Sequence, residues 1–275
     1  MIREFKLRNA NDAVYDLNNL DNFFHNFKGL GQEYKVTYMQ FGSRYSKSKE
    51  ILNQKKISGT IRFKSYEGFY NFSRFIQHKP LVLEYTSHET YYLDVSIDKL
   101  EKSEFEEGGL KCNISMTSLG TYYRTVKKAI LENDEESGGK VYPFEYPYTY
   151  TDSASGEVII QSDSVLESPC KIHIFGPCVN PNYTHYVDDK VVATGKINCS
   201  VEEGKKLVID ATVIPYSIGI YTTDNEYVEN VYEKSDFNTA RFLNLKYGKN
   251  VISIKHETTE AVKAIIEGRL EYESV

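Results

Sequence analysis

The stretch KISGTIRFKSYEGFYNFSRFIQHKPLVLEYTS, Lys56 to Ser87, predicts a strand, one helix and a second strand. Apolar and polar residues alternate in KISGTIRFKS and again in LVLEYTS, and a period of two is typical of strands that bury one face. Between these segments the apolar spacing changes to that of a helix. This change of period indicates a sheet with a single helix packed against it.

The expected helix has signals at both ends. Ser65 is a suitable N-cap, Glu67 places a carboxylate in the first turn, and Pro80 stops the helix. The apolar positions recur at i, i+3 and i+7; they are Phe69, Phe72 and Ile76. An aromatic stripe at this spacing is more often a core face than a ligand site. We therefore expect these three side chains to lie on the sheet.

Three more segments of the first half predict strands with one buried face: YKVTYMQFG (Tyr34–Gly42), YYLDVSIDKL (Tyr91–Leu100) and GLKCNISMTSL (Gly109–Leu119). In the last of them Leu110, Cys112, Ile114 and Met116 alternate, so Cys112 should face a core. The tetrapeptide HETY between two of the strands is typical of a short hairpin turn.

A change of composition predicts a boundary near the middle of the chain. LENDEESGGK, residues 131–140, is acidic and then glycine-rich, which is typical of a linker or an exposed loop. YPFEYPYTY, residues 142–150, contains prolines that exclude a central strand, so it should be extended across a surface. We therefore predict two domains, residues 1–135 and residues 136–275.

The second half consists of short apolar runs separated by turn residues: EVIIQSD, PCKIHIFG, KVVATGKI, KKLVIDATV, TARFLNLKYGKNVISIKHE and AVKAIIEGRLEYES. KYGKN, Lys246 to Asn250, predicts a hairpin connection between LNL and VISI. Six such runs without a helix indicate an antiparallel β-sandwich or jelly roll. The expected fold class is mainly β, with the only helix in the first half.

Composition excludes several classes of function. The net charge of −6 has no basic excess, so the chain as a whole would repel nucleic acid rather than attract it. No apolar run approaches the ~20 residues that a bilayer requires, so we expect no membrane partner. Four cysteines in 275 residues are too few for a disulfide framework, which favours folding in a reducing cytosol.

The stretch HIFGPCVNPNY, His173 to Tyr183, raises the question of a metal site or a nucleophile, because it follows Cys170 and contains Cys178. The strand period places Cys170 and His173 on opposite faces, so the two side chains cannot share a metal ion. Cys178 lies between prolines and turn residues, in an expected irregular connection. The ligand spacing matches no known zinc module. We predict a strand and a turn, with no metal ligand and no cofactor.

The sequence contains no catalytic template: no GxSxG, phosphate-binding loop, GxGxxG or HExxH. Five histidines are expected at the surface because their neighbours are polar: His25, His78, His88, His185 and His256. The carboxylate pairs Asp188–Asp189 and Glu202–Glu203 are typical of polar turns, with a calcium site at the first as an alternative. We therefore predict no catalytic residue, and the binding residues stay unassigned.

The order of several segments resembles the distal tail proteins of long-tailed bacteriophages. GTIRFKS precedes YEGFYNFSRFI, PLVLEYTS, YYLDVSIDKLEKSE and GGLKCNISMTSLGTYYR, which ends in the pair Tyr122–Tyr123. SPCKIHIFGPCVNPNY, GKKLVID and FLNLKYGKNVISI follow in the second half. No single motif is specific, and the resemblance depends on their succession over most of the chain.

This resemblance implies a ring, usually of six copies, formed through an N-terminal β-sandwich that has one helix and an extended arm. The ring would join the tail tube to the baseplate or receptor-binding apparatus. A C-terminal β-sandwich of galectin or carbohydrate-binding type would complete the chain. The expected location is the virion tail tip, after a stay in the host cytoplasm. An arm that clasps a neighbouring copy is expected in residues 121–150, from their aromatic residues and prolines.

Two other functions remain open at the level of sequence. The C-terminal sandwich could bind a host cell-wall saccharide, since the chain has 23 tyrosines; the absence of tryptophan, which often stacks on sugar rings, argues against this. A tail-associated hydrolase with an unrecognised carboxylate pair is the third possibility. The leading expectation is a structural hub that is not an enzyme and has tail tube and baseplate or receptor-binding proteins as partners.

Overall fold

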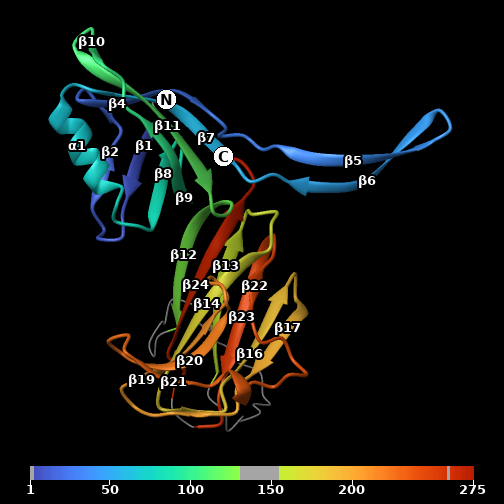
Figure 1. Cartoon of the computed structure of the whole chain (residues 1–275). Helices are drawn as coiled ribbons and strands as arrows, with labels where there is room; N and C mark the ends of the chain where they lie inside the picture. The colour runs from blue at the N-terminus through green and yellow to red at the C-terminus, as the bar shows by residue number, and fades with distance from the viewer. Residues whose placement is uncertain (1–2, 131–154, 259–260) are drawn as a thin grey trace, which may run out of the picture. The chain divides into compact units, whose positions relative to one another are not determined.

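The computed structural model describes residues 3–130, 155–258 and 261–275, and its fold is mainly β with a single α-helix in these residues (Figure 1). The chain forms two compact units. Unit 1 comprises Met1–Arg124 and Tyr272–Val275, and unit 2 comprises Thr125–Glu271. The linker expected at 131–140 and the aromatic stretch at 142–150 lie outside the described residues, so the boundary at 135 stays a prediction.

Unit 1 contains one antiparallel sheet that curls over a single core. The strands follow the order β2-β1-β8-β9-β11-β7-β4-β3. Their bounds are β1 Glu4–Arg8, β2 Val14–Asp16, β3 Asn18–Asn19, β4 Asn22–Lys28, β7 Lys56–Phe63, β8 Leu81–Thr86, β9 Thr90–Glu101 and β11 Gly109–Ser118. The two-residue strand β10, Phe105–Glu106, extends the end of β11.

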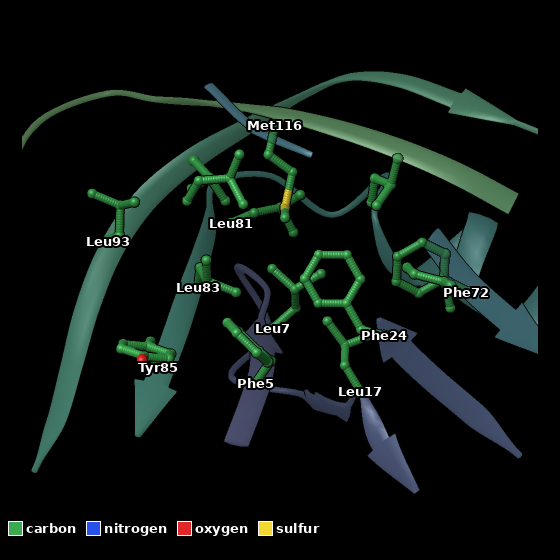
Figure 2. Packing of buried hydrophobic residues seen from close by; sticks show 14 of the residues in the cluster. Phe5, Leu7, Leu17, Phe24, Phe72, Leu81, Leu83, Tyr85, Leu93 and Met116 are labelled. Atoms are coloured by element: carbon green, nitrogen blue, oxygen red, sulfur yellow. The ribbon is translucent and has the colours of Figure 1, made fainter. Parts of the chain in front are cut away.

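The two ends of this sheet order meet in the core. The ring of Phe5, on β1, lies 5.3 Å from the ring of Phe24, on β4, between their centroids. Leu7 and Leu17 are buried beside them, as Figure 2 shows. Because strands near both ends of the order face one another, the sheet closes into a sandwich, which is the arrangement expected from the sequence. The apolar positions predicted on β11, including Cys112, are all buried and are confirmed.

Helix α1, Tyr66–Phe75, confirms the prediction of the opening stretch. The Ser65 hydroxyl accepts a hydrogen bond from the Gly68 N–H at 3.1 Å, which caps the helix. Phe72 is fully buried and contacts the rings of Tyr15 and Phe63 at centroid distances of 5.0 and 5.4 Å. The helix therefore packs on the sheet through the aromatic face that its spacing predicts.

Unit 2 contains two antiparallel sheets. The first has the order β13-β23-β16-β17, with β13 Ser155–Ser162, β16 Asn182–Val187, β17 Lys190–Lys196 and β23 Gly248–Lys255. The second continues from β21 through β20, β19 and β14 to β24, with β14 Ser168–Phe175, β19 Lys205–Asp210, β20 Ser217–Thr222, β21 Tyr227–Asn230 and β24 Ala264–Tyr272. Strand β12, Tyr122–Ile130, carries the chain from unit 1 into unit 2. This confirms the predicted second sandwich.

The predicted hairpin at KYGKN is wrong. Strand β22, Asn244–Leu245, pairs with β14, whereas β23 pairs with β13 and β16 in the other sheet. The connection therefore passes from one sheet to the other. The buried Asn250 side chain holds it, because its amide donates to the carbonyls of Lys246 and Gly248 at 2.8 and 3.0 Å. A side chain thus satisfies backbone groups that a hairpin ladder would otherwise pair.

Candidate assembly surface

Strands β5, Tyr34–Phe41, and β6, Arg44–Leu52, form a two-stranded sheet of their own, which we call the arm (residues 34–52). Its turn is Gly42–Ser43, and Gly42 has a positive φ of 61°, as such a tight turn requires. Figure 1 shows the arm extending from the sandwich of unit 1 as a separate ribbon. No residue of the arm belongs to the core cluster of unit 1.

Large apolar side chains of the arm are exposed to solvent: Tyr38 at 60 %, Met39 at 50 %, Phe41 at 62 %, Tyr45 at 69 % and Ile51 at 46 %. The sequence-based expectation that residues 34–42 bury one face is therefore wrong within this chain. An isolated two-stranded hairpin is at best marginally stable in water. Exposed aromatic residues on such a hairpin are typical of a surface that another protein covers.

The arm expected at residues 121–150 stays a prediction for most of its length. Residues 122–130 form strand β12, and the remaining residues from 131 onward lie outside the described part of the chain. The sequence does contain a signal for the observed arm that was missed. RYSKSKEIL, residues 44–52, places polar or charged side chains at almost every position. Such a strand has no buried face, and it follows YKVTYMQF after only two residues.

The root of the arm is held by unit 1. The backbone N–H of Asn53 donates to the carbonyl of Glu33 at 2.8 Å, which closes the base of the hairpin. Gly29 precedes it with a φ of 86°, and a Cβ added there would lie 1.9 Å from the Lys56 carbonyl oxygen. Only glycine allows this close approach of two backbone segments.

Two side chains at the root have perturbed ionisation. The hydroxyl of Tyr34 donates a short hydrogen bond to the carboxylate of Glu273, and this hydrogen bond raises the pKa of the tyrosine. Lys55 is only 6 % exposed; its ammonium donates to the Gly31 carbonyl at 2.7 Å and lies 5.4 Å from the centre of the Tyr122 ring. Burial lowers the pKa of this lysine. The arm is thus anchored to the last residues of the chain and to buried groups of unit 1.

A cavity of about 660 Å³ lies at the arm root and is lined by Gly29, Gly31, Gln32, Glu33, Asn53, Gln54, Lys55 and Lys56. Its lining contains one carboxylate, two lysines and no histidine or cysteine. The lining therefore offers no hydroxyl or thiol nucleophile, no imidazole and no pair of carboxylates. In the described residues, no three side chains of histidine, cysteine, aspartate or glutamate are grouped as metal ligands, and this includes Asp188–Asp189. No helix described here could cross a bilayer.

The cysteines in and just before HIFGPCVNPNY, Cys178 and Cys170, have buried side chains that pack in unit 2. Cys170, Ile172 and Ile174 are buried on one face of β14, while His173 lies on the other face, as predicted. The expected irregular connection at Cys178 is wrong. Cys178 lies in the short strand β15, Cys178–Val179, which pairs with β18, Ser200–Val201. Burial raises the pKa of the Cys170 and Cys178 thiols to about 12. Both thiols are protonated at neutral pH and are poor nucleophiles.

Two histidines expected at the surface are buried, His185 at 1 % exposure and His256 at 2 %. The Asn250 amide nitrogen donates to backbone carbonyls, so its oxygen faces His185 and accepts from Nε2–H at 2.9 Å. Burial lowers the pKa of His185, although the Asn250 contact opposes this. His185 is therefore a neutral donor in the core of unit 2, at the point where the chain changes sheets.

This burial predicts a dependence of stability on pH. The unfolded chain takes up a proton on His185 near the ordinary value of 6.5, whereas the folded chain does so only at lower pH. The contribution of neutral His185 to the free energy of unfolding is complete above pH 6.5, and it is lost as the pH falls toward the pKa of the folded chain. Urea unfolding is measured at about pH 7.5 and at about pH 5. The free energy of unfolding should fall less between these two pH values in His185→Gln than in the native protein. An equal loss in both proteins would contradict this assignment.

Residues 4–119 match the sequence model of the family described as distal tail protein, N-terminal domain. The match covers the sandwich, helix α1 and the arm. This part of the chain belongs to that domain family. The match agrees with the resemblance that the order of the segments in the first half predicts.

The solved structures that are similar to this chain cover both of its units. A chain of the phage P2 baseplate, in its activated conformation with Ca, is 16 % identical, with a TM-score of 0.66 and complete coverage of both chains. The Dit protein of SPP1, described as a paradigm of the hub adsorption apparatus in phages that infect Gram-positive bacteria, is 8 % identical. Its TM-score is 0.63, with 98 % of this chain and 99 % of that chain covered. These likenesses show the fold. A comparison with curated protein sequences gives no match.

Unit 2 contains an aromatic group that bears on saccharide binding. The exposed rings of Tyr216 and Phe237 flank those of Tyr232 and Phe242. The Arg241 guanidinium lies 5.4 Å from the Tyr232 ring centre and 4.9 Å from that of Phe237. The guanidinium therefore lies against two of the four rings, while Tyr216 and Phe237 keep exposed surface. The comparisons with known proteins do not favour the saccharide-binding alternative.

Proposed function

We propose that this chain is a phage distal tail protein that forms a closed ring of six copies through its N-terminal domain, and that the ring joins the tail tube to baseplate or receptor-binding proteins. The copy number comes from the family resemblance. The observation that carries the proposal is the arm, a two-stranded sheet with five large apolar side chains exposed between 46 % and 69 %. It contributes nothing to the core of its own unit, and a neighbouring copy is the surface that would cover it.

The contact in such a ring is heterologous, because each copy offers one surface to the copy before it and a different one to the copy after it. A projecting arm suits this arrangement. It reaches beyond its own sandwich, and stable interfaces bury about 1,000 Å² or more in total. The division into a ring-forming domain, residues 1–135, and a second sandwich, residues 136–275, is part of this proposal. So is assembly in the host cytoplasm before incorporation at the virion tail tip.

The proposed protein acts through assembly and not through catalysis. Its cysteine thiols in the described residues are buried, and the lining of the cavity at the arm root has no serine, cysteine or histidine. We propose other tail and baseplate proteins as the partners of unit 2, because the similar solved structures are parts of phage baseplates and adsorption hubs. Electron microscopy of the purified protein tests the ring. Class averages with six-fold symmetry are expected, and two-fold or asymmetric particles would contradict the proposal.

A further inference from the structure

The two faces of the arm differ in chemistry. Strand pairing places Lys35 opposite Ile51, Met39 opposite Ser46 and Phe41 opposite Arg44, and Lys49 pairs with Thr37 on the same side. This side, which we call the cationic face, carries Lys35, Met39, Phe41, Arg44, Lys49 and Ile51. The other side carries Tyr34, Val36, Tyr38 and Tyr45, with Lys47 and Glu50 joined in an ion pair of 2.6 Å.

The cations of the cationic face have no carboxylate partner in the part of the chain that the structure describes. Lys35, Arg44 and Lys49 are exposed and form no ion pair there. The arm as a whole has four basic side chains and one acidic side chain, a formal charge of +3. The whole chain carries −6, so the residues outside the arm carry −9. The arm is thus opposite in charge to the rest of its own protein.

An acidic surface lies at the free edge of the sheet in unit 1. Residues 9–27 contain three carboxylates, Asp12, Asp16 and Asp21, and no lysine or arginine. We call the exposed part of this segment, residues 12–21, the acidic edge. Strand β2 pairs only with β1, so its other side is open. The cations close by are paired: Arg8 with Glu84 at 2.6 Å, and Lys6, which lies opposite Asp16, with Glu4 at 3.6 Å. Lys64 pairs with Asp21 of the acidic edge at 3.2 Å, so among the described residues Asp12 and Asp16 are the edge carboxylates that form no ion pair.

The acidic edge also has exposed apolar side chains. Tyr15 points inward to Phe72, so its neighbours Val14 and Asp16 point outward along β2. Val14 is 48 % exposed, and Leu20, in the turn between β3 and β4, is 98 % exposed. Carboxylates beside Val14 and Leu20 complement cations beside Met39, Phe41 and Ile51. Figure 1 shows the arm leaving unit 1 on the side away from β2, as a head-to-tail contact requires.

We propose that the cationic face of the arm docks on the acidic edge of the next copy of the chain. This inference rests on the proposed ring and specifies its contact. A second copy is favoured over nucleic acid, because phosphate contacts use cations and give no role to three exposed apolar side chains on the same face. Electrostatic complementarity then sets which surfaces meet, while the apolar side chains supply buried area.

Charge exchange tests the contact. Arg44→Glu/Lys49→Glu leaves the cationic face with one lysine and two glutamates, and Asp12→Lys/Asp16→Lys leaves the acidic edge with two lysines and the paired Asp21. Each double variant should raise the concentration for half-assembly at least about 10-fold, because like charges meet across each interface. The chain with all four substitutions should recover assembly, since an arm face with a negative net charge then meets an edge with a positive net charge. Glu104→Lys/Glu106→Lys, at two exposed carboxylates elsewhere in unit 1, is the matched control and should assemble normally.

The outcomes separate the inference from the proposed function. Absolute mass and thermal unfolding are measured for each variant, so that an unfolded variant is recognised. Recovery in the four-fold variant supports the contact. If the native chain forms the ring and the edge variant assembles as well as the control, the docking site is wrong and the ring stands. The proposed docking is also overturned if the native chain binds duplex DNA and the arm variant loses this binding without any change in mass. A native chain that forms no ring refutes the proposed function itself.

Discussion

Replacement of residues 35–51 by a short Gly-Ser turn is expected to leave unit 1 folded and to abolish the ring. The strand ends at Tyr34 and Leu52 are paired, so a short turn can join them. No arm residue belongs to the core cluster, so the free energy of unfolding of unit 1 should change little. Assembly should weaken at least about 100-fold, because aromatic and arginine side chains that become buried at interfaces each contribute about 2 kcal/mol or more.

The measurement is the absolute mass of the native and shortened chains over the same concentration range, with circular dichroism as a check of the fold. A shortened chain that still forms the native assembly would show that the arm is not the main contact. A chain that unfolds would show instead that the arm stabilises its own unit, contrary to its exposure.

Phe72→Ala should have the largest effect on the stability of unit 1. Phe72 is fully buried and, among the aromatic side chains of α1, contacts both Tyr15 and Phe63. Truncation of a buried phenylalanine leaves a cavity and costs about 3–5 kcal/mol of unfolding free energy. Tyr70→Ala, on the same helix but 51 % exposed, should cost less than about 1 kcal/mol.

Chemical denaturation is best carried out in the chain with the shortened arm, where assembly does not contribute to the apparent stability. If Phe72→Ala and Tyr70→Ala lower the free energy of unfolding by nearly equal amounts, the packing of α1 on the sheet is contradicted. The comparison is matched, since both substitutions remove one aromatic ring from the same helix.

Local physical signals in the sequence predicted much of the fold. Ser65 can cap only a helix that begins beside it, and the spacing of Phe69 and Phe72 indicates the face that packs. On β11 the alternation that includes Cys112 and Met116 indicates both the strand and its buried side. These signals depend on residues close together in the chain, which is why they can be interpreted without a structure.

The candidate site and the sheet connections depend on contacts between distant residues. Alternation in Tyr34–Phe41 predicts a strand, but only the structure shows that no other part of unit 1 covers it. At KYGKN a glycine between two strands suggests a hairpin, whereas Asn250 instead holds a crossing between sheets. His185 has polar neighbours in sequence, yet its partner Asn250 is 65 residues away. Burial of this kind has no local signature.

The absolute mass of the native chain in solution, measured by light scattering over about a 100-fold range of concentration, tests the central claim most directly. A closed symmetric ring with extensive interfaces should persist over such a range. The expected species has roughly 190 kDa, six times the 31.7 kDa of one chain. A mass of one chain at every concentration would contradict the ring, and with it the role of the arm as the contact between copies.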